Sequence, residues 1–261
     1  MDTARIAELL EPFLHGTISA PASNLCHSEP AKAGEEPAVL SSAQLHRIST
    51  YIDILLRWNA RINLTAIRDP EDIVRRHFGE SLFAARQLLS SASSASSVSS
   101  VVHTSDPVPP VPSVVHSSGP VSSVVRSLHT VADIGSGAGF PGLPMKLWAP
   151  RISLTLIESN HKKATFLREV VRALTLTDVN IRNTRAEAFS ETFDLVTLRA
   201  VEHFESILPT AATLVAPGGR LALLIGSSQI ADAHTSLPHL SWSTPTPIPL
   251  SRTRVLTVAQ L

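Results

Sequence analysis

The chain has 261 residues, 43% of them hydrophobic, and its 22 basic side chains balance its 22 acidic ones. This length suits one large domain or a core domain with a smaller one, and zero net charge argues against nucleic-acid binding by electrostatics alone. The sequence has no run of 18 apolar residues that would predict a membrane span, and its first apolar segment contains acids, unlike a secretory signal. The single Cys26 excludes an intramolecular disulfide and a cysteine-based zinc site. We therefore expect a cytoplasmic protein without a membrane partner.

Helices are expected throughout the first third of the chain. Residues 4–14 form a short apolar helix. Ser41 and Gln44 have the spacing of a capping box, which predicts that a longer helix begins there. Asp69 followed by Pro70 predicts the start of the next helix, because Asp is a preferred N-cap and Pro fits the first helical position.

Two segments have the composition of loops. Residues 17–39 contain Pro, Ser, Gly and Glu with little periodicity. Residues 90–128 hold fifteen Ser, ten Val and five Pro, and they repeat the fragment S-V-V at irregular spacing. We interpret this second segment as a disordered low-complexity insertion rather than a solenoid. The expected organisation is therefore a helical region over residues 1–89, the insertion over 90–128, and a ligand-binding domain over 129–261.

From residue 130 onward, apolar strands alternate with helices. The expected strands are residues 131–134, 153–157, 179–182, 193–198, 220–225 and 254–259. This alternation predicts an α/β fold with a doubly wound, Rossmann-like, mainly parallel sheet that helices cover on both faces. Ligands of such sheets bind at the carboxyl ends of the strands.

A glycine-rich turn, V-A-D-I-G-S-G-A-G-F-P-G, follows the first of these strands. Gly137, Gly139 and Gly142 fit the dinucleotide pattern G-x-G-x-x-G, whereas Gly135, Gly137 and Gly139 fit a G-x-G-x-G pattern that suits S-adenosylmethionine. Asp133 favours the second interpretation, because a carboxylate at the strand end suits a ligand with an ammonium and a sulfonium better than a pyrophosphate. A glycine-rich turn without a ligand is the alternative.

Polar residues at the ends of later strands complete the candidate site. Glu158 ends the second strand, where a carboxylate can accept hydrogen bonds from both ribose hydroxyls of a nucleoside. Ala186 and Glu187 follow the third strand, where an acid could meet an adenine amino group or lie on a solvent-exposed turn. Arg199 ends the fourth strand beside the first, which favours a functional role over a structural salt bridge, because burying an unpaired arginine is costly.

Basic residues gather in two parts of the sequence. Seven Lys or Arg stand against three acids in residues 151–185, and six Arg against four acids in residues 57–86. Such clusters are usually solvated helix faces, although a basic surface beside a site would also suit a polyanion.

The chain resembles the bacterial 16S ribosomal RNA guanine-N7 methyltransferases of the RsmG (GidB) family. The resemblance covers residues 45–89 and 131–226, and it depends on the motifs R-W-N, N-L-T, R-H and G-F-P-G. It implies cofactor contacts at Gly135, Phe140, Ala186, Glu187 and Arg199. The chain departs from the family in its long insertion and in Ile225-Gly226, where relatives have Lys-Gly.

The resemblance implies methyl transfer from S-adenosylmethionine to N7 of a guanine in the 530 loop of 16S ribosomal RNA, as free RNA or in the small subunit. No general base is needed, because N7 has a free lone pair, and aligning the reactants can contribute roughly 7–11 kcal/mol. Arg76, His77 and Arg199 are the candidate RNA contacts, although His77 also fits a helix-packing face. Asn63 is expected to help fix the loop between the helical region and the sheet, and a monomer without a metal is expected.

The sequence also leaves two other functions open. An NAD-dependent oxidoreductase would need a hydride-transfer partner such as a Tyr-x-x-x-Lys pair, and the single tyrosine, Tyr51, lies in the helical region. A non-catalytic RNA-binding module on a methyltransferase fold is the second alternative.

Overall fold

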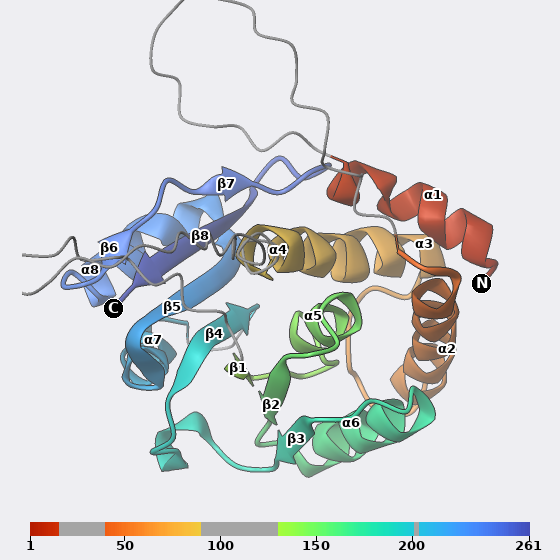
Figure 1. The fold of residues 1–261 in the computed structure, drawn as a ribbon, viewed down its shortest axis with the longest axis horizontal. Coiled ribbons are helices and arrows are strands. Elements are labelled where there is room, and N and C mark those ends of the chain that lie inside the picture. Colours follow the sequence, from red (N-terminus) through yellow and green to blue (C-terminus); the bar gives the residue numbers. More distant parts are fainter. Residues whose placement is uncertain (16–39, 90–129, 201–203) are drawn as a thin grey trace, which may run out of the picture.

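The computed structural model describes residues 1–15, 40–89, 130–200 and 204–261 as a central sheet between helices (Figure 1). The expected loop over residues 17–39 and the expected insertion over 90–128 lie outside this described part. No helix within it is long and apolar enough to cross a membrane.

The sheet has eight strands in the order β3-β2-β1-β4-β5-β8-β6, with β7 paired to β8. The strands are β1 (Thr130–Ile134), β2 (Ser153–Ile157), β3 (Val179–Arg182), β4 (Phe193–Arg199), β5 (Val215–Gly226), β6 (Ser241–Trp242), β7 (Thr246–Pro247) and β8 (Arg254–Gln260). Strands β1 to β5 pair in parallel, and β6, β7 and β5 each pair with β8 in antiparallel fashion. The predicted doubly wound sheet is confirmed. Because β4 lies beside β1, their carboxyl ends meet at the point where ligands bind in such sheets.

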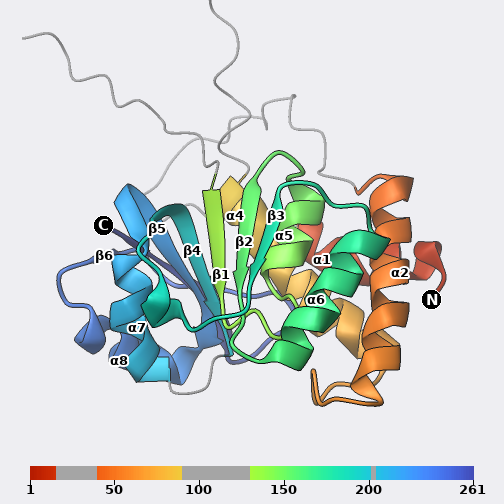
Figure 2. The same cartoon turned by 90° about the horizontal axis from the view of Figure 1, so that it is seen from below.

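Helices cover both faces of the sheet (Figure 2). One face carries α1 (Thr3–Leu14), α2 (Ser42–Asn59), α3 (Pro70–Asp72), the π-helix η1 (Ile73–Gly79), α4 (Glu80–Leu89), α5 (Gly142–Trp148) and α6 (His161–Ala173). The other face carries η3 (Ala186–Ala188), α7 (Phe204–Thr213), η4 (Ser227–Gln229) and α8 (Ile230–Ser236). Alternate strand residues divide between the two apolar cores, so that Val131 packs on the first face and Ala132 on the second.

The predicted helix starts are confirmed. The Ser41 side chain accepts a hydrogen bond from Gln44 N, and the Gln44 side chain accepts one from Ser41 N, which completes the capping box of α2. The Asp69 side chain accepts from Asp72 N, and Pro70 is the first residue of α3. The π-helical turn that follows was not predicted, because its apolar residues repeat much as they would in an α-helix.

Asn59, rather than Asn63, fixes the loop after α2. The Asn59 side chain is buried; its Oδ1 accepts from Leu64 N at 2.9 Å and Thr65 N at 3.1 Å, and its Nδ2 donates to Thr65 O at 2.9 Å. Asn63 is exposed to solvent. The loop after α2 is therefore held by Asn59, the residue that ends the helix, and the role expected for Asn63 between the helical region and the sheet stays a prediction.

The variant Asn59→Ala should lower the free energy of unfolding by about 1–3 kcal/mol, since it leaves buried backbone groups without partners. Asn63→Ala is the matched control, with an expected change within about 0.5 kcal/mol because the side chain is exposed. Urea unfolding of both variants measures the difference. An equal loss in the two variants would contradict this assignment.

Candidate cofactor and substrate site

The glycine-rich turn follows the carboxyl end of β1 and adopts a backbone conformation that requires glycine. Gly135, Gly137 and Gly139 have φ angles of 66°, 52° and 86°. Gly135 N donates to Ile157 O at 2.9 Å, and Gly139 N donates to Ser136 O at 2.6 Å. The first hydrogen bond holds the turn against the end of β2, and the second closes the turn on itself. The three glycines adopt the left-handed region that other residues rarely adopt.

The glycines differ in what surrounds them. A Cβ on Gly139 would collide with the Tyr51 hydroxyl and Leu143, and one on Gly142 would lie 2.8 Å from Leu156 Cδ2. A Cβ on Gly137 would meet no atom closer than 3.6 Å. Packing inside the protein therefore requires Gly139 and Gly142, while Gly137 borders open space at the carboxyl edge.

Asp133 supports the turn from inside. Its side chain is fully buried, and its two oxygens accept hydrogen bonds from Thr197 Oγ1 at 3.0 Å and Gly142 N at 3.1 Å. Burial raises the pKa of Asp133 from 3.8 to about 7, against the opposing effect of these hydrogen bonds. The carboxylate therefore joins β1 to β4 and to the start of α5. A direct contact between Asp133 and a ligand stays a prediction.

Glu158 lies beside the turn at the end of β2. Its Oε2 accepts from Gly137 N at 2.9 Å and its Oε1 from Asn160 N at 2.7 Å. The side chain is nearly buried. Glu158, which the sequence predicts to bind the ribose hydroxyls, therefore lies next to Gly137. Each oxygen of its carboxylate can accept a further hydrogen bond.

Phe140 connects the turn to the helical layer. Its ring stacks on Tyr51 with a centroid distance of 5.5 Å and on His77 at 4.8 Å. The Tyr51 hydroxyl donates to Ala138 O inside the turn. Sequence reasoning missed this role of Tyr51, because a tyrosine in an apolar helix face carries no sign of its partner. The geometry means that α2 and η1 help to set the position of the turn.

Arg199 is held in a network of buried polar groups. Its Nη2 donates to Glu80 Oε2 at 2.9 Å and to Arg76 O at 2.6 Å, and its Nη1 donates to His77 Nδ1 at 3.1 Å. The side chains of Arg199 and Glu80 are 8% and 4% exposed, so this ion pair lies in the interior. Arg254 Nε lies 2.9 Å from the same Glu80 oxygen. Sequence reasoning missed Glu80, which supplies the partner that a buried arginine requires.

His77 is neutral in this network. A guanidinium can only donate, so His77 Nδ1 accepts from Arg199 and the ring carries its proton on Nε2, which lies 2.7 Å from Thr65 Oγ1. Burial first, and then the nearby arginines, lower the pKa of His77 to about 3. The ring is 9% exposed and stacks on Phe140, which gives it the packing role that the sequence left open.

The remaining predicted residues lie around this centre. Ala186 is buried in η3, and Glu187 beside it is exposed. Since η3 follows β3, both lie at the carboxyl edge of the sheet. Arg76 exposes its side chain while its carbonyl contacts Arg199. The structure brings Asp133, the glycine turn, Glu158 and Phe140 together directly, and it places Ala186, Glu187 and the Arg76 side chain at the margin.

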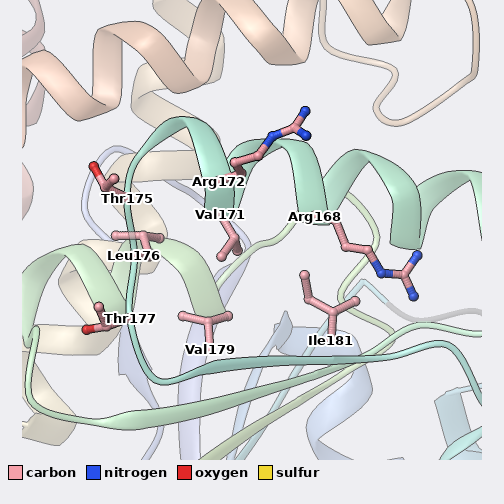
Figure 3. A pocket seen from close by; sticks show the side chains of 8 residues that line it. All are labelled: Arg168, Val171, Arg172, Thr175, Leu176, Thr177, Val179 and Ile181. Carbon is pink, nitrogen blue, oxygen red and sulfur yellow. The ribbon is translucent and has the colours of Figure 1, made fainter.

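A separate groove lies between α6 and the edge strand β3 (Figure 3). It has a volume of about 520 Å³, an apolar floor that includes Val171, Leu176 and Ile181, and two arginines, Arg168 and Arg172, along α6. It contains none of the predicted site residues.

The sequence matches known proteins over most of its length. The GidB family, described as rRNA small subunit methyltransferase G, matches residues 44–98 and 114–244. The chain belongs to the GidB family. A Ribosomal RNA small subunit methyltransferase G from Chloroflexus aggregans is 34% identical over 207 residues, which cover 76% of this chain and 72% of the relative. One from Xylella fastidiosa is 33% identical over 191 residues and covers 72% of each chain.

Two solved structures show a weaker likeness. A ribosomal protein L11 methylase from Lactobacillus delbrueckii subsp. bulgaricus has a TM-score of 0.46 and 17% identity, over 53% of this chain and 72% of that one. M. jannaschii TYW2 in complex with AdoMet has a TM-score of 0.43 and 14% identity, over 51% and 68% of the two chains.

Taken by itself, the buried neutral His77 should contribute less to stability in acid. Its pKa of about 3 lies below the ordinary 6.5, so at this group the unfolded state binds more protons between these values, and the contribution of His77 to the free energy of unfolding falls as the pH falls. The stability advantage of wild type over His77→Gln should shrink by about 2 kcal/mol between pH 7 and pH 5. Urea unfolding at both pH values measures it.

The exposed His161, at the start of α6, provides the control for this measurement. The difference in unfolding free energy between wild type and His161→Gln should change less between the two pH values than the difference for His77→Gln, because the His161 side chain is exposed and the His77 ring is buried. A pH-independent difference for His77→Gln would show that the pKa of His77 is the same in the folded and unfolded protein, and would contradict its burial as a neutral ring.

Proposed function

We propose that this member of the GidB family transfers a methyl group from S-adenosylmethionine to ribosomal RNA of the small subunit, at N7 of a guanine in the 530 loop. Membership of a methyltransferase family supports the reaction class, and the names of the relatives support the RNA substrate. The observation that carries the proposal is the adjacency of Gly137 and Glu158 at the carboxyl edge of β1 and β2. Since the proposed substrate is ribosomal RNA, we expect the protein to act in the cytoplasm.

The residues at this edge fit the cofactor. Gly137 borders open space, so a nucleoside can approach its backbone closely. Glu158 would hold the ribose hydroxyls, while Gly135, Gly139 and Phe140 fix the turn and Ala186 and Glu187 would flank the adenine. Arg199 Nε is buried and has no hydrogen-bond partner in the described part of the chain, which leaves one donor available at this site. When bound, S-adenosylmethionine supplies an electrophilic methyl carbon on a sulfonium.

The chain need not remove a proton from the substrate. Guanine N7 carries a free lone pair, so the protein contributes by positioning the base in line with the methyl carbon and by excluding water. His77 is unsuited to act as a base here, because its Nδ1 accepts from Arg199 and its Nε2 carries the ring proton. The network around Glu80 instead holds Arg199 in a fixed place beside Phe140, with the guanidinium carbon 5.9 Å from the ring centroid.

Gly137→Leu should abolish cofactor binding while the protein still folds. The left-handed backbone costs a leucine roughly 1–2 kcal/mol, and a Cβ at this position would meet no atom closer than 3.6 Å. Titration calorimetry with S-adenosylmethionine should show affinity at least tenfold lower, or about 1.4 kcal/mol. NAD serves as the negative ligand for wild type.

Gly218→Leu is the matched control for this variant. Gly218 has a φ of 75° and no atom within 4 Å of a built Cβ, and it lies near the amino end of β5, away from the turn. It should lose similar stability and keep its affinity for S-adenosylmethionine. Normal binding by Gly137→Leu would contradict the proposed cofactor site.

The reaction itself is tested by mapping 7-methylguanosine in 16S ribosomal RNA. Purified protein, S-adenosylmethionine and RNA from a strain that lacks this methylation should yield one new 7-methylguanosine in the 530 loop. Parallel reactions with naked RNA and with small subunits identify the preferred substrate. Methylation at another position, or at another atom of guanine, would overturn the finer assignment, and no methylation of either substrate would overturn the proposed activity.

A further inference from the structure

A second cavity opens next to the Arg199 network. It has a volume of about 350 Å³ and lies between the π-helix η1 and the connection from β7 to β8, which reaches the end of α1 (Figure 1). Glu80 lines this cavity and also holds Arg199. Arg254, in its wall, pairs with Gly226 at the carboxyl end of β5. The cavity therefore lies at the same edge of the sheet as the glycine turn.

The cavity is lined by more positive than negative side chains. Four arginines line it, together with two acids: Arg75, Arg76, Arg252, Arg254, Asp72 and Glu80. Arg75 is paired with Glu71 and Asp72, and Arg254 with Glu80. The two that remain, Arg76 and Arg252, are exposed and have no acidic partner among the described residues.

Two arginines that lack acidic partners and line the same cavity suit a bound phosphate. The guanidinium group presents a planar fork of donors that matches phosphate oxygens, and it stays charged at any physiological pH. The two arginines come from segments far apart in the sequence, η1 and the turn before β8, and they converge on one cavity. Arg76 also connects the cavity to the site, because its carbonyl accepts from Arg199.

We propose that this cavity binds a backbone phosphate of the substrate RNA close to the target nucleotide, with Arg76 and Arg252 as the phosphate contacts. The inference rests on the proposed function, since it takes RNA as the substrate. A bound phosphate at this point would fix the RNA relative to Arg199, and Glu80 would keep Arg254 and Arg199 in place while their neighbours engage the anion. The lining arginines therefore have two roles: Arg75 and Arg254, which are paired with acids, build the wall, and the unpaired Arg76 and Arg252 bind the phosphate.

The test is the salt dependence of RNA binding. Fluorescence anisotropy with a labelled single-stranded fragment of the 530 loop is recorded over a series of salt concentrations for wild type, Arg76→Gln and Arg252→Gln. Each variant should bind about tenfold more weakly, and each should reduce the slope of log K against log salt by about 0.7, because one phosphate contact is lost. Calorimetry should show unchanged affinity for S-adenosylmethionine.

Arg172→Gln is the matched control, because Arg172 lines the groove on the opposite edge strand β3 and the charge change is the same (Figure 3). It should leave the slope unchanged. An equal loss in all three variants would show that net charge alone acts and would overturn the cavity assignment.

The remaining outcomes separate this inference from the proposed function. If wild type methylates the RNA and the two cavity variants bind it with the wild-type slope, the cavity assignment is wrong and the proposed function stands. If wild type binds S-adenosylmethionine but neither binds nor methylates the RNA, both are wrong.

Discussion

One carboxylate oxygen holds the candidate site together. Glu80 Oε2 lies 2.9 Å from both Arg199 Nη2 and Arg254 Nε. Two arginines without this partner would repel each other in a region with little water, and a buried charge that loses its partner costs several kcal/mol. Glu80 therefore joins the carboxyl end of β4 and the amino end of β8 to the start of α4, and without it the two cations would turn toward solvent.

The helical layer and the sheet form the site jointly. The glycine turn belongs to the sheet, but Phe140 inserts between Tyr51 of α2 and His77 of η1. Aromatic stacking of this kind adds about 0.5–1.5 kcal/mol beyond the buried area. The N-terminal helices therefore help to position the candidate site, since Tyr51 and His77 hold one wall of the glycine-rich turn in place.

Local sequence patterns predicted six of the eight described strands, the helix starts and the carboxylate at the end of β2, because each depends on neighbours within a few residues. They missed β6 and β7, which have two residues each and are too short to show a pattern. They did not predict the partners of Arg199 and Tyr51. Glu80 and Arg199 are 119 positions apart, and Tyr51 and Ala138 are 87 apart. No spacing rule connects such residues, so only the packed fold identifies them. The π-helical turn escaped prediction for a related reason, since its apolar pattern is close to that of an α-helix.

Asp133 and His77 respond to acid in opposite directions. Burial raises the pKa of the Asp133 carboxyl to about 7 and lowers that of the His77 imidazole to about 3. Between roughly pH 4 and pH 6.5, folding makes the aspartic acid keep a proton and makes the histidine give one up. On folding, the proton that Asp133 takes up offsets the proton that His77 releases. The two perturbed groups therefore have opposing effects on the pH dependence of the free energy of unfolding over the mildly acidic range. Because the two contributions oppose each other, a buried acid and a buried imidazole can lie in one core without narrowing the pH range over which the protein stays folded.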